Sequence, residues 1–122
     1  MKSISVVSLV TLFLVGCLSV MDGVICTEIF IYGLNVTVTD GNGDPVSGAA
    51  LTLVEGDYTE IMMEIDAMGQ PGVYVGAGER AGTYSLTIEA DGFDTVTLDD
   101  ITIDADECHV IPVGLALSLT AL

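Results

Sequence analysis

The stretch Val36-Thr37-Val38-Thr39-Asp40-Gly41-Asn42-Gly43-Asp44-Pro45 decides the fold. Its first half continues an alternation of apolar and polar side chains that begins before Leu34, which is typical of a strand with one buried and one wet face. Its second half concentrates Asp, Gly, Asn and Pro, the residues that end a strand in a turn. An alternating strand followed by such a turn recurs along the rest of the chain.

Period-two segments follow the first strand at regular intervals, and no window shows an apolar period of 3.6 with caps. In the second of these segments, Ile61, Met63 and Ile65 share a face. A glycine-rich loop is expected at 76–82, and a last strand from about Cys108 to Leu119. About seven short strands with turns every 8–12 residues predict an all-β fold, a single antiparallel β-sandwich. The other alternating segments are 49–53, 73–75, 84–89, 96–98 and 101–103.

Composition narrows the classes of function. The 122 residues include 2 Lys+Arg and 18 Asp+Glu, a formal net charge of −16. Such a polyanion repels phosphate backbones, so nucleic acid is excluded as a partner. A hydrophobic content of 51% excludes a disordered acidic tail. His109 is the single histidine, so the chain has few residues from which to form a His-based catalytic triad or a His-rich metal site.

The N-terminus has the layout of an export signal, with one cation, Lys2, before an apolar run over 4–15. This run is too short to span a bilayer comfortably. The following Leu14-Val15-Gly16-Cys17 resembles the lipobox of bacterial lipoproteins, which implies cleavage before Cys17 and acylation of that residue. We therefore expect a signal peptide at 1–16, a lipidated Cys17 with a tether over 17–28, and a domain at 29–122. Leu18 stands where an Asp would resemble an inner-membrane retention signal, so outer-membrane delivery is the default; a secreted protein is the alternative.

If Cys17 carries lipid, Cys26 and Cys108 remain. Export places them in an oxidising compartment, where a disulfide is expected. The bridge would tie the start of the first strand to the start of the last and contribute roughly 4–5 kcal/mol in the chain-entropy model. Two free buried thiols are the alternative. Cys26, Cys108 and His109 do not have the spacing of a zinc site.

Two motifs carry a family resemblance. The opening stretch, continued through Val46-Ser47-Gly48-Ala49, is similar to the start of the carboxypeptidase regulatory-like domain. The segment Ala81-Gly82-Thr83-Tyr84-Ser85-Leu86-Thr87-Ile88-Glu89-Ala90-Asp91-Gly92-Phe93 resembles its glycine–aromatic strand. The resemblance covers about residues 30–119 and implies a prealbumin-like sandwich. In this setting we expect the ring of Tyr84 in the core and its hydroxyl on a loop backbone.

Candidate ligand sites are acidic. Asp40, Asn42 and Asp44 match the start of a calcium loop, but Pro45 replaces the glycine, and a turn explains the same residues. A denser acidic rim could bind Ca²⁺ or serve only as a solvated edge that blocks strand pairing. Asn35-Val36-Thr37 has the form of a glycosylation sequon, which we interpret as a chance match in a bacterial protein. The acidic rim comprises Asp99, Asp100, Asp104, Asp106 and Glu107.

The sequence thus predicts a non-enzymatic, membrane-anchored lipoprotein of the cell envelope with no required cofactor. It would act as a structural or interaction module, with an envelope protein or a glycan as its partner. One alternative is a calcium- or carbohydrate-binding module that uses the acidic rim. The other is a small hydrolase on a transthyretin-like fold, for which this chain lacks the several His and Arg residues and the C-terminal tyrosine motif of those enzymes.

Overall fold

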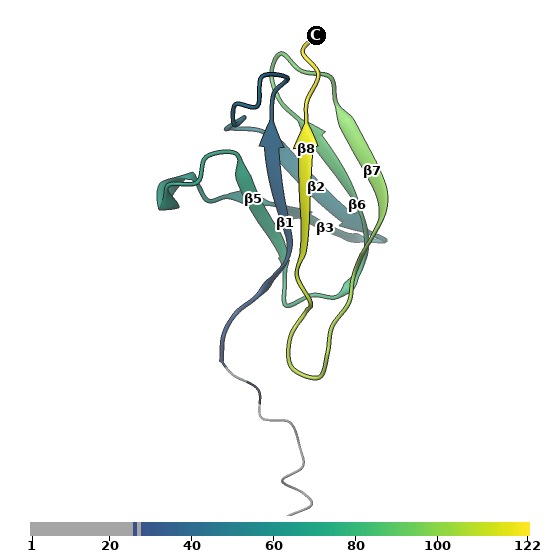
Figure 1. Cartoon of the computed structure of the whole chain (residues 1–122). Helices are drawn as coiled ribbons and strands as arrows, with labels where there is room; N and C mark the ends of the chain where they lie inside the picture. Colours follow the sequence, from purple (N-terminus) through teal and green to yellow (C-terminus); the bar gives the residue numbers. More distant parts are fainter. Residues whose placement is uncertain (1–25, 27) are drawn as a thin grey trace, which may run out of the picture.

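The computed structural model describes residue 26 and residues 28–122, and this part of the chain forms eight strands and one short 3-10 helix (Figure 1). The predicted signal peptide 1–16 and Cys17 lie outside the described residues, as does most of the tether. No helix in the described part is long and apolar enough to cross a membrane. The elements are β1 (Tyr32–Thr39), β2 (Ala50–Glu55), β3 (Tyr58–Ile61), β4 (Met63–Glu64), η1 (Asp66–Met68), β5 (Val73–Gly78), β6 (Gly82–Glu89), β7 (Val96–Ile103) and β8 (Val113–Ser118).

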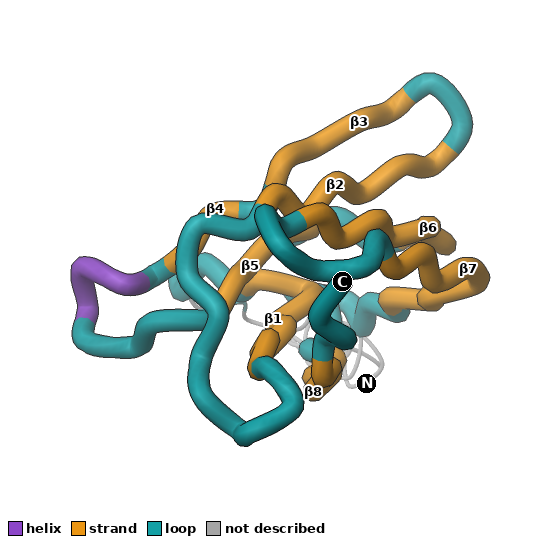
Figure 2. The backbone as a smooth tube through the Cα atoms, turned by 90° about the horizontal axis from the view of Figure 1, so that it is seen from above, coloured by secondary structure: helices purple, strands orange, loops and turns teal. Residues whose placement is uncertain are grey.

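The strands form two sheets that face each other, which confirms the predicted all-β sandwich. One sheet has the order β4-β5-β1-β8 and the other β3-β2-β6-β7. All pairings are antiparallel except β1 with β8, which is parallel and corrects the expectation of a purely antiparallel fold. In Figure 2 the sheets approach each other where β3 leads into β4 and diverge between β7 and β8.

The core consists of the inward-facing alternate residues of both sheets. Leu34, Val36 and Val38 of β1 are fully buried, as the alternation in the opening stretch predicts. They pack with buried residues of the second sheet into one hydrophobic cluster. The partners in that sheet include Leu51, Leu53, Tyr84, Leu86, Ile88 and Ile103.

The chain changes sheets at Met62, and here the predicted face is wrong. Ile61 and Met63, expected to share an apolar face, are 68% and 50% exposed, whereas Met62 between them is buried. β3 pairs with β2 of one sheet and β4 pairs with β5 of the other, so the single strand predicted over 61–65 is divided between the two sheets. The Met62 N–H donates to the Leu51 carbonyl at this crossing. The crossing breaks the period of two, because the residue at the corner turns into the space between the sheets.

Two other boundaries differ from the prediction. β5 continues to Gly78, so the first three residues of the expected glycine-rich loop belong to a strand. A Cβ at Gly76 would lie 2.9 Å from the Met62 side chain, which explains why this strand position carries no side chain. β8 begins at Val113 instead of Cys108. Residues 104–111 instead fold back on themselves, with Ala105 and Val110 paired as an isolated bridge.

The segments expected at 96–98 and 101–103 are one strand with a bulge. Tyr84 pairs with Ile101 and Leu86 with Leu98, so β7 has one extra residue opposite β6. Asp100 takes a φ of 59° there. The bulge restores the inward direction of Ile101 and Ile103, which are buried.

Candidate functional site

The end of the sandwich at which the chain enters is closed by a disulfide. Cys26 and Cys108 are bonded across 82 residues of sequence, with their Cα atoms 5.2 Å apart. The expected pairing is therefore present, and it consumes the Cys108 thiol. Neighbouring His109 cannot activate that sulfur as a nucleophile, since a disulfide sulfur carries no proton to abstract.

Glu79 ties three segments together beside this disulfide. Its carboxylate accepts hydrogen bonds from the Ile31 N–H at 2.9 Å and the Val110 N–H at 3.3 Å, and lies 2.7 Å from His109 Nδ1. Partial burial acts to raise the pKa of Glu79, but the contacts with His109, Ile31 and Val110 outweigh it and hold the pKa below its usual value. Sequence reasoning missed Glu79. Its only sequence cue is its place after Gly76 and Gly78, and its φ of 47° has no signature in the residue type.

The acidic rim does not assemble into a cation site. Asp106 accepts hydrogen bonds from the Cys108 and His109 N–H groups at 2.8 and 2.9 Å, so this carboxylate closes the turn of the 104–111 loop. Those two bonds, led by the one from His109, lower the pKa of Asp106. Among the described residues, no three His, Cys, Asp or Glu side chains are grouped as metal ligands. Asp99 and Asp100 belong to the β7 bulge, and Asp104 and Glu107 are exposed in the loop that follows.

The second acidic motif is a turn. Asp40 Oδ1 accepts hydrogen bonds from the Asn42 and Asp44 N–H groups at 2.8 and 3.0 Å, and Gly43 takes a φ of 85°. This is the local bonding that Asp supplies in an Asx turn. Asn35 of the sequon lies in the middle of β1, flanked by β5 and β8.

Arg80 and Tyr84 stabilise the loop between β5 and β6. The buried Tyr84 donates its hydroxyl to the Arg80 carbonyl at 2.7 Å, as expected for a core ring with a polar tip. The Arg80 guanidinium bonds to Glu55 at 2.7 Å and lies 3.6 Å from the centre of the Tyr58 ring. The hydrogen bonds to Tyr84 and Glu55 raise the pKa of Arg80. Arg80 is the only Lys or Arg side chain in the part of the chain that the structure describes, and it is engaged in this structural network.

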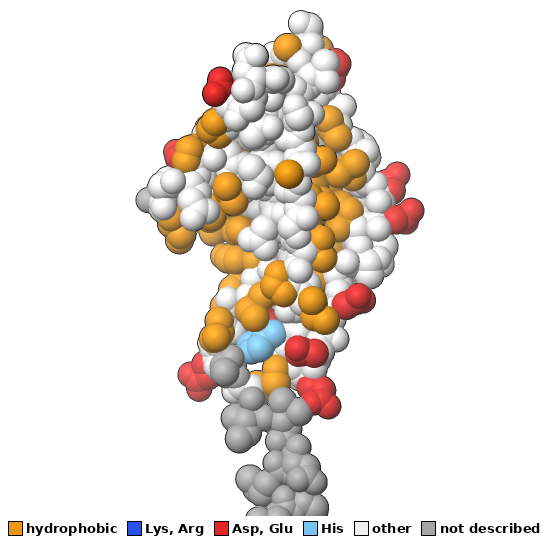
Figure 3. All heavy atoms as spheres, viewed as in Figure 1, with side chains coloured by type: hydrophobic (Ala, Val, Ile, Leu, Met, Phe, Trp, Pro, Cys, Tyr) orange, Lys and Arg blue, Asp and Glu red, His pale blue; other side chains and the backbone are white. Residues whose placement is uncertain are grey.

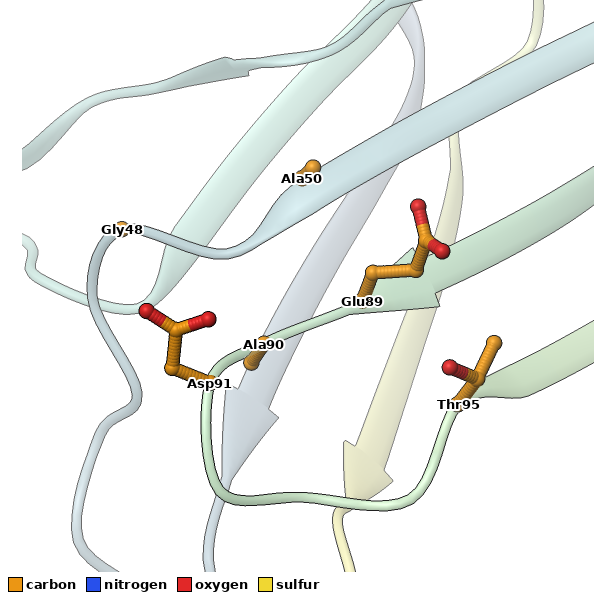
Figure 4. A pocket seen from close by; sticks show the side chains of 6 residues that line it. All are labelled: Gly48, Ala50, Glu89, Ala90, Asp91 and Thr95. Carbon is orange, nitrogen blue, oxygen red and sulfur yellow. The ribbon is translucent and has the colours of Figure 1, made fainter.

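Two shallow pockets lie at the opposite end of the sandwich. One, of about 280 Å³, is lined by Glu89, Asp91, Thr95 and small residues of the 48–50 segment. Figure 4 shows the Asp91 carboxylate directed toward Gly48 and the Glu89 carboxylate directed away from it, so the two acids do not converge on one point. The other pocket, of about 410 Å³, combines Phe93, Leu119 and Ala121 with polar groups of the Asp40 turn and the C-terminal segment.

None of these places brings together the groups that acid–base or nucleophilic catalysis needs. Such catalysis requires a base within hydrogen-bond reach of a reacting group and an orienting partner. His109, the residue with the most suitable chemistry, follows Cys108 of the disulfide and contacts Glu79, and it lines neither pocket. Hydrolase chemistry on this fold therefore gains no support from the described residues.

Comparison with known proteins identifies the family of the domain. A search of curated proteins gives no match. The model of the carboxypeptidase regulatory-like domain matches residues 33–116, more than half of the chain, and this span contains both motifs singled out in the sequence. With two facing sheets and the buried Tyr84 in place, the chain belongs to the carboxypeptidase regulatory-like domain family.

Proposed function

We propose that this chain is a membrane-anchored lipoprotein of the cell envelope, held by acylated Cys17, that acts as a non-enzymatic interaction module. The observation that carries the proposal is the Cys26–Cys108 disulfide. Disulfides persist in oxidising compartments, which fits a chain exported behind an apolar signal. The carboxypeptidase regulatory-like domain is a regulatory, non-catalytic type of domain, which supports the second half of the proposal.

The end of the sandwich that carries the Cys26–Cys108 disulfide suits attachment to a lipid anchor. Eight residues lie between Cys17 and Cys26, so the two cysteines are at most about 30 Å apart along an extended chain. The disulfide and the Glu79 contacts fix the first described residues to the 104–111 loop. A force applied through the tether would therefore act on the sandwich at a covalently cross-linked point. The β1–β2 and β6–β7 connections, which supply lining residues of both pockets, lie at the end of the sandwich opposite residues 28–31 (Figure 1).

Metabolic labelling with an alkyne analogue of palmitate tests the anchor. The wild-type chain should take the label and sediment with membranes, because two or three acyl chains give stable attachment. Cys17→Ser should lose the label and appear in the soluble fraction. The matched control, Cys26→Ser with Cys108→Ser, keeps Cys17 and should label like wild type. Label that persists in Cys17→Ser would overturn the proposal.

A further inference from the structure

We infer that the free edge of β8 is a binding site for an extended, cationic polypeptide segment that adds to the sheet as a further strand. The inference rests on the proposed function, since it specifies the partner class of the interaction module. It starts from the sheet order, in which β8 is the last strand and pairs with β1 alone. Edge strands of this kind accept added strands through their unpaired backbone groups.

The backbone direction identifies the groups available for pairing. The Leu119 N–H donates to the Thr39 carbonyl at 2.8 Å, so the backbone N–H and C=O groups of the odd-numbered residues in this segment point toward β1. The backbone N–H and C=O groups of Gly114, Ala116 and Ser118 consequently point away from β1, toward the open edge of the sheet. Beyond them the edge is occupied, because the Thr120 carbonyl accepts a hydrogen bond from the Asp94 N–H at 2.9 Å. The open length of edge is therefore that of β8 itself.

β8 lacks the features that block pairing at the other edges. β4 is two residues long, β3 is four residues long and carries Glu60, and β7 contains a bulge with two aspartates. Short strands, bulges and charges all discourage strand addition. β8 has six residues, Val-Gly-Leu-Ala-Leu-Ser, with no charge and no bulge. The positions on its solvent-facing side are Gly114, Ala116 and Ser118, all exposed, so no large side chain stands beside the open edge there.

An apolar strip beside this edge provides a place for side chains. Because the sheets diverge between β7 and β8, several inward residues of both strands remain only partly buried (Figure 2). Figure 3 shows hydrophobic side chains running along this side of the molecule, with acidic side chains beyond them. A strand added to β8 would place every second side chain over this strip. The strip consists of Val96, Leu98, Val113, Leu115 and Leu117.

Charge decides which kind of strand fits. Asp99 and Asp100 project from the β7 bulge next to the strip, and neither is in an ion pair within the described residues. The whole chain has a formal net charge of −16, so a second copy is repelled and a cationic segment is attracted. The occupant is thus an extended segment in which apolar residues alternate with Lys or Arg.

Binding of a fluorescein-labelled ten-residue peptide of alternating Val and Lys tests the inference by anisotropy on the full chain in detergent. The peptide should bind, and affinity should fall when NaCl is raised from about 50 to about 500 mM. A peptide with Glu in place of Lys should not bind. Amide hydrogen exchange should slow at Gly114, Ala116 and Ser118 when the Val–Lys peptide is added, a readout that needs no variant.

Ala116→Pro removes an outward N–H that the sheet does not use, so the fold should tolerate it while affinity falls about tenfold or more. Ala116→Thr keeps the N–H and should bind like wild type. Asp99→Asn with Asp100→Asn should weaken binding and reduce its salt dependence. Peptide binding without protection of the β8 amides, or a β8-paired dimer of the chain, would overturn the inference. Absence of peptide binding would also overturn it, and palmitate labelling at Cys17 would then still support the anchored module.

Discussion

Asp100 shows how one residue sets the direction of a strand. Its φ of 59° lies in the left-handed region, which costs a side chain with a Cβ free energy but which Asp and Asn tolerate better than other residues. The bulge it forms moves the inward register of β7 by one residue, so that Leu98 and Ile101 both face the core side. The spacing of three between these apolar residues is visible in the sequence and could have predicted the bulge.

Two substitutions at Asp100 should differ in their effect on stability. Asp100→Gly relieves the strained φ and should be neutral or stabilising by a few tenths of a kcal/mol, whereas Asp100→Val should destabilise by about 1–2 kcal/mol. Urea unfolding followed by circular dichroism measures both. Equal destabilisation by Gly and Val would show that the carboxylate, and not the backbone angle, matters at this position.

Glu79 should make stability depend on acid pH. Its pKa in the folded state lies below the ordinary 4.5. A carboxyl with a depressed pKa stabilises the fold above its unfolded pKa, and this contribution is lost as the pH falls through the folded value. Wild type should therefore exceed Glu79→Gln in urea midpoint at about pH 7, and the gap should narrow toward about pH 3. A gap that stays constant over this range would contradict the assignment.

Among the elements, pairing between distant strands was the part that the sequence could not predict. Alternation located the inner faces of β1, β2 and β6, because each stays within one sheet and one face is buried. It did not reveal that β8 runs parallel to β1, since a period of two is the same in either direction. It also failed at Met62, where the chain crosses between sheets and the period restarts.

The site was predicted to a smaller extent than the fold. The disulfide partners followed from cysteine counting together with the predicted export signal, and the role of Tyr84 followed from its strand motif. Glu79 and the open edge of β8 depend on which strands become neighbours, so no local pattern could indicate them.

Close contact between β1 and its neighbours depends on a glycine at position 33. A Cβ there would lie 2.9 Å from the Ala77 carbonyl oxygen and 2.7 Å from an Ile103 methyl group. Gly33→Ala should therefore destabilise by about 1–3 kcal/mol, because backbone must move to make room. Gly114→Ala is the matched control, since a Cβ at Gly114 meets nothing within 4 Å. Urea midpoints measure the difference, and equal effects of the two changes would refute the packing argument.

At the scale of the whole molecule, the disulfide links the start of the described chain to the loop before β8 and stabilises the fold. It closes a loop of 82 residues, which corresponds to about 4.5 kcal/mol in the chain-entropy model. That is a large share of the stability typical of a domain of this size. Cys26→Ser with Cys108→Ser should lower the free energy of unfolding by an amount of this order, as measured by urea denaturation. Reduction of the wild-type protein should give the same loss, and no loss in either experiment would contradict the account.

The central claim is that an acylated Cys17 holds a sandwich whose entry end is closed by the other two cysteines. Intact-mass spectrometry of the native protein, alkylated without reductant, tests it most directly. The account predicts a chain that begins at Cys17, carries two or three acyl chains and takes up no alkyl group. An unacylated amino end, or alkylation of Cys26 and Cys108, would contradict it.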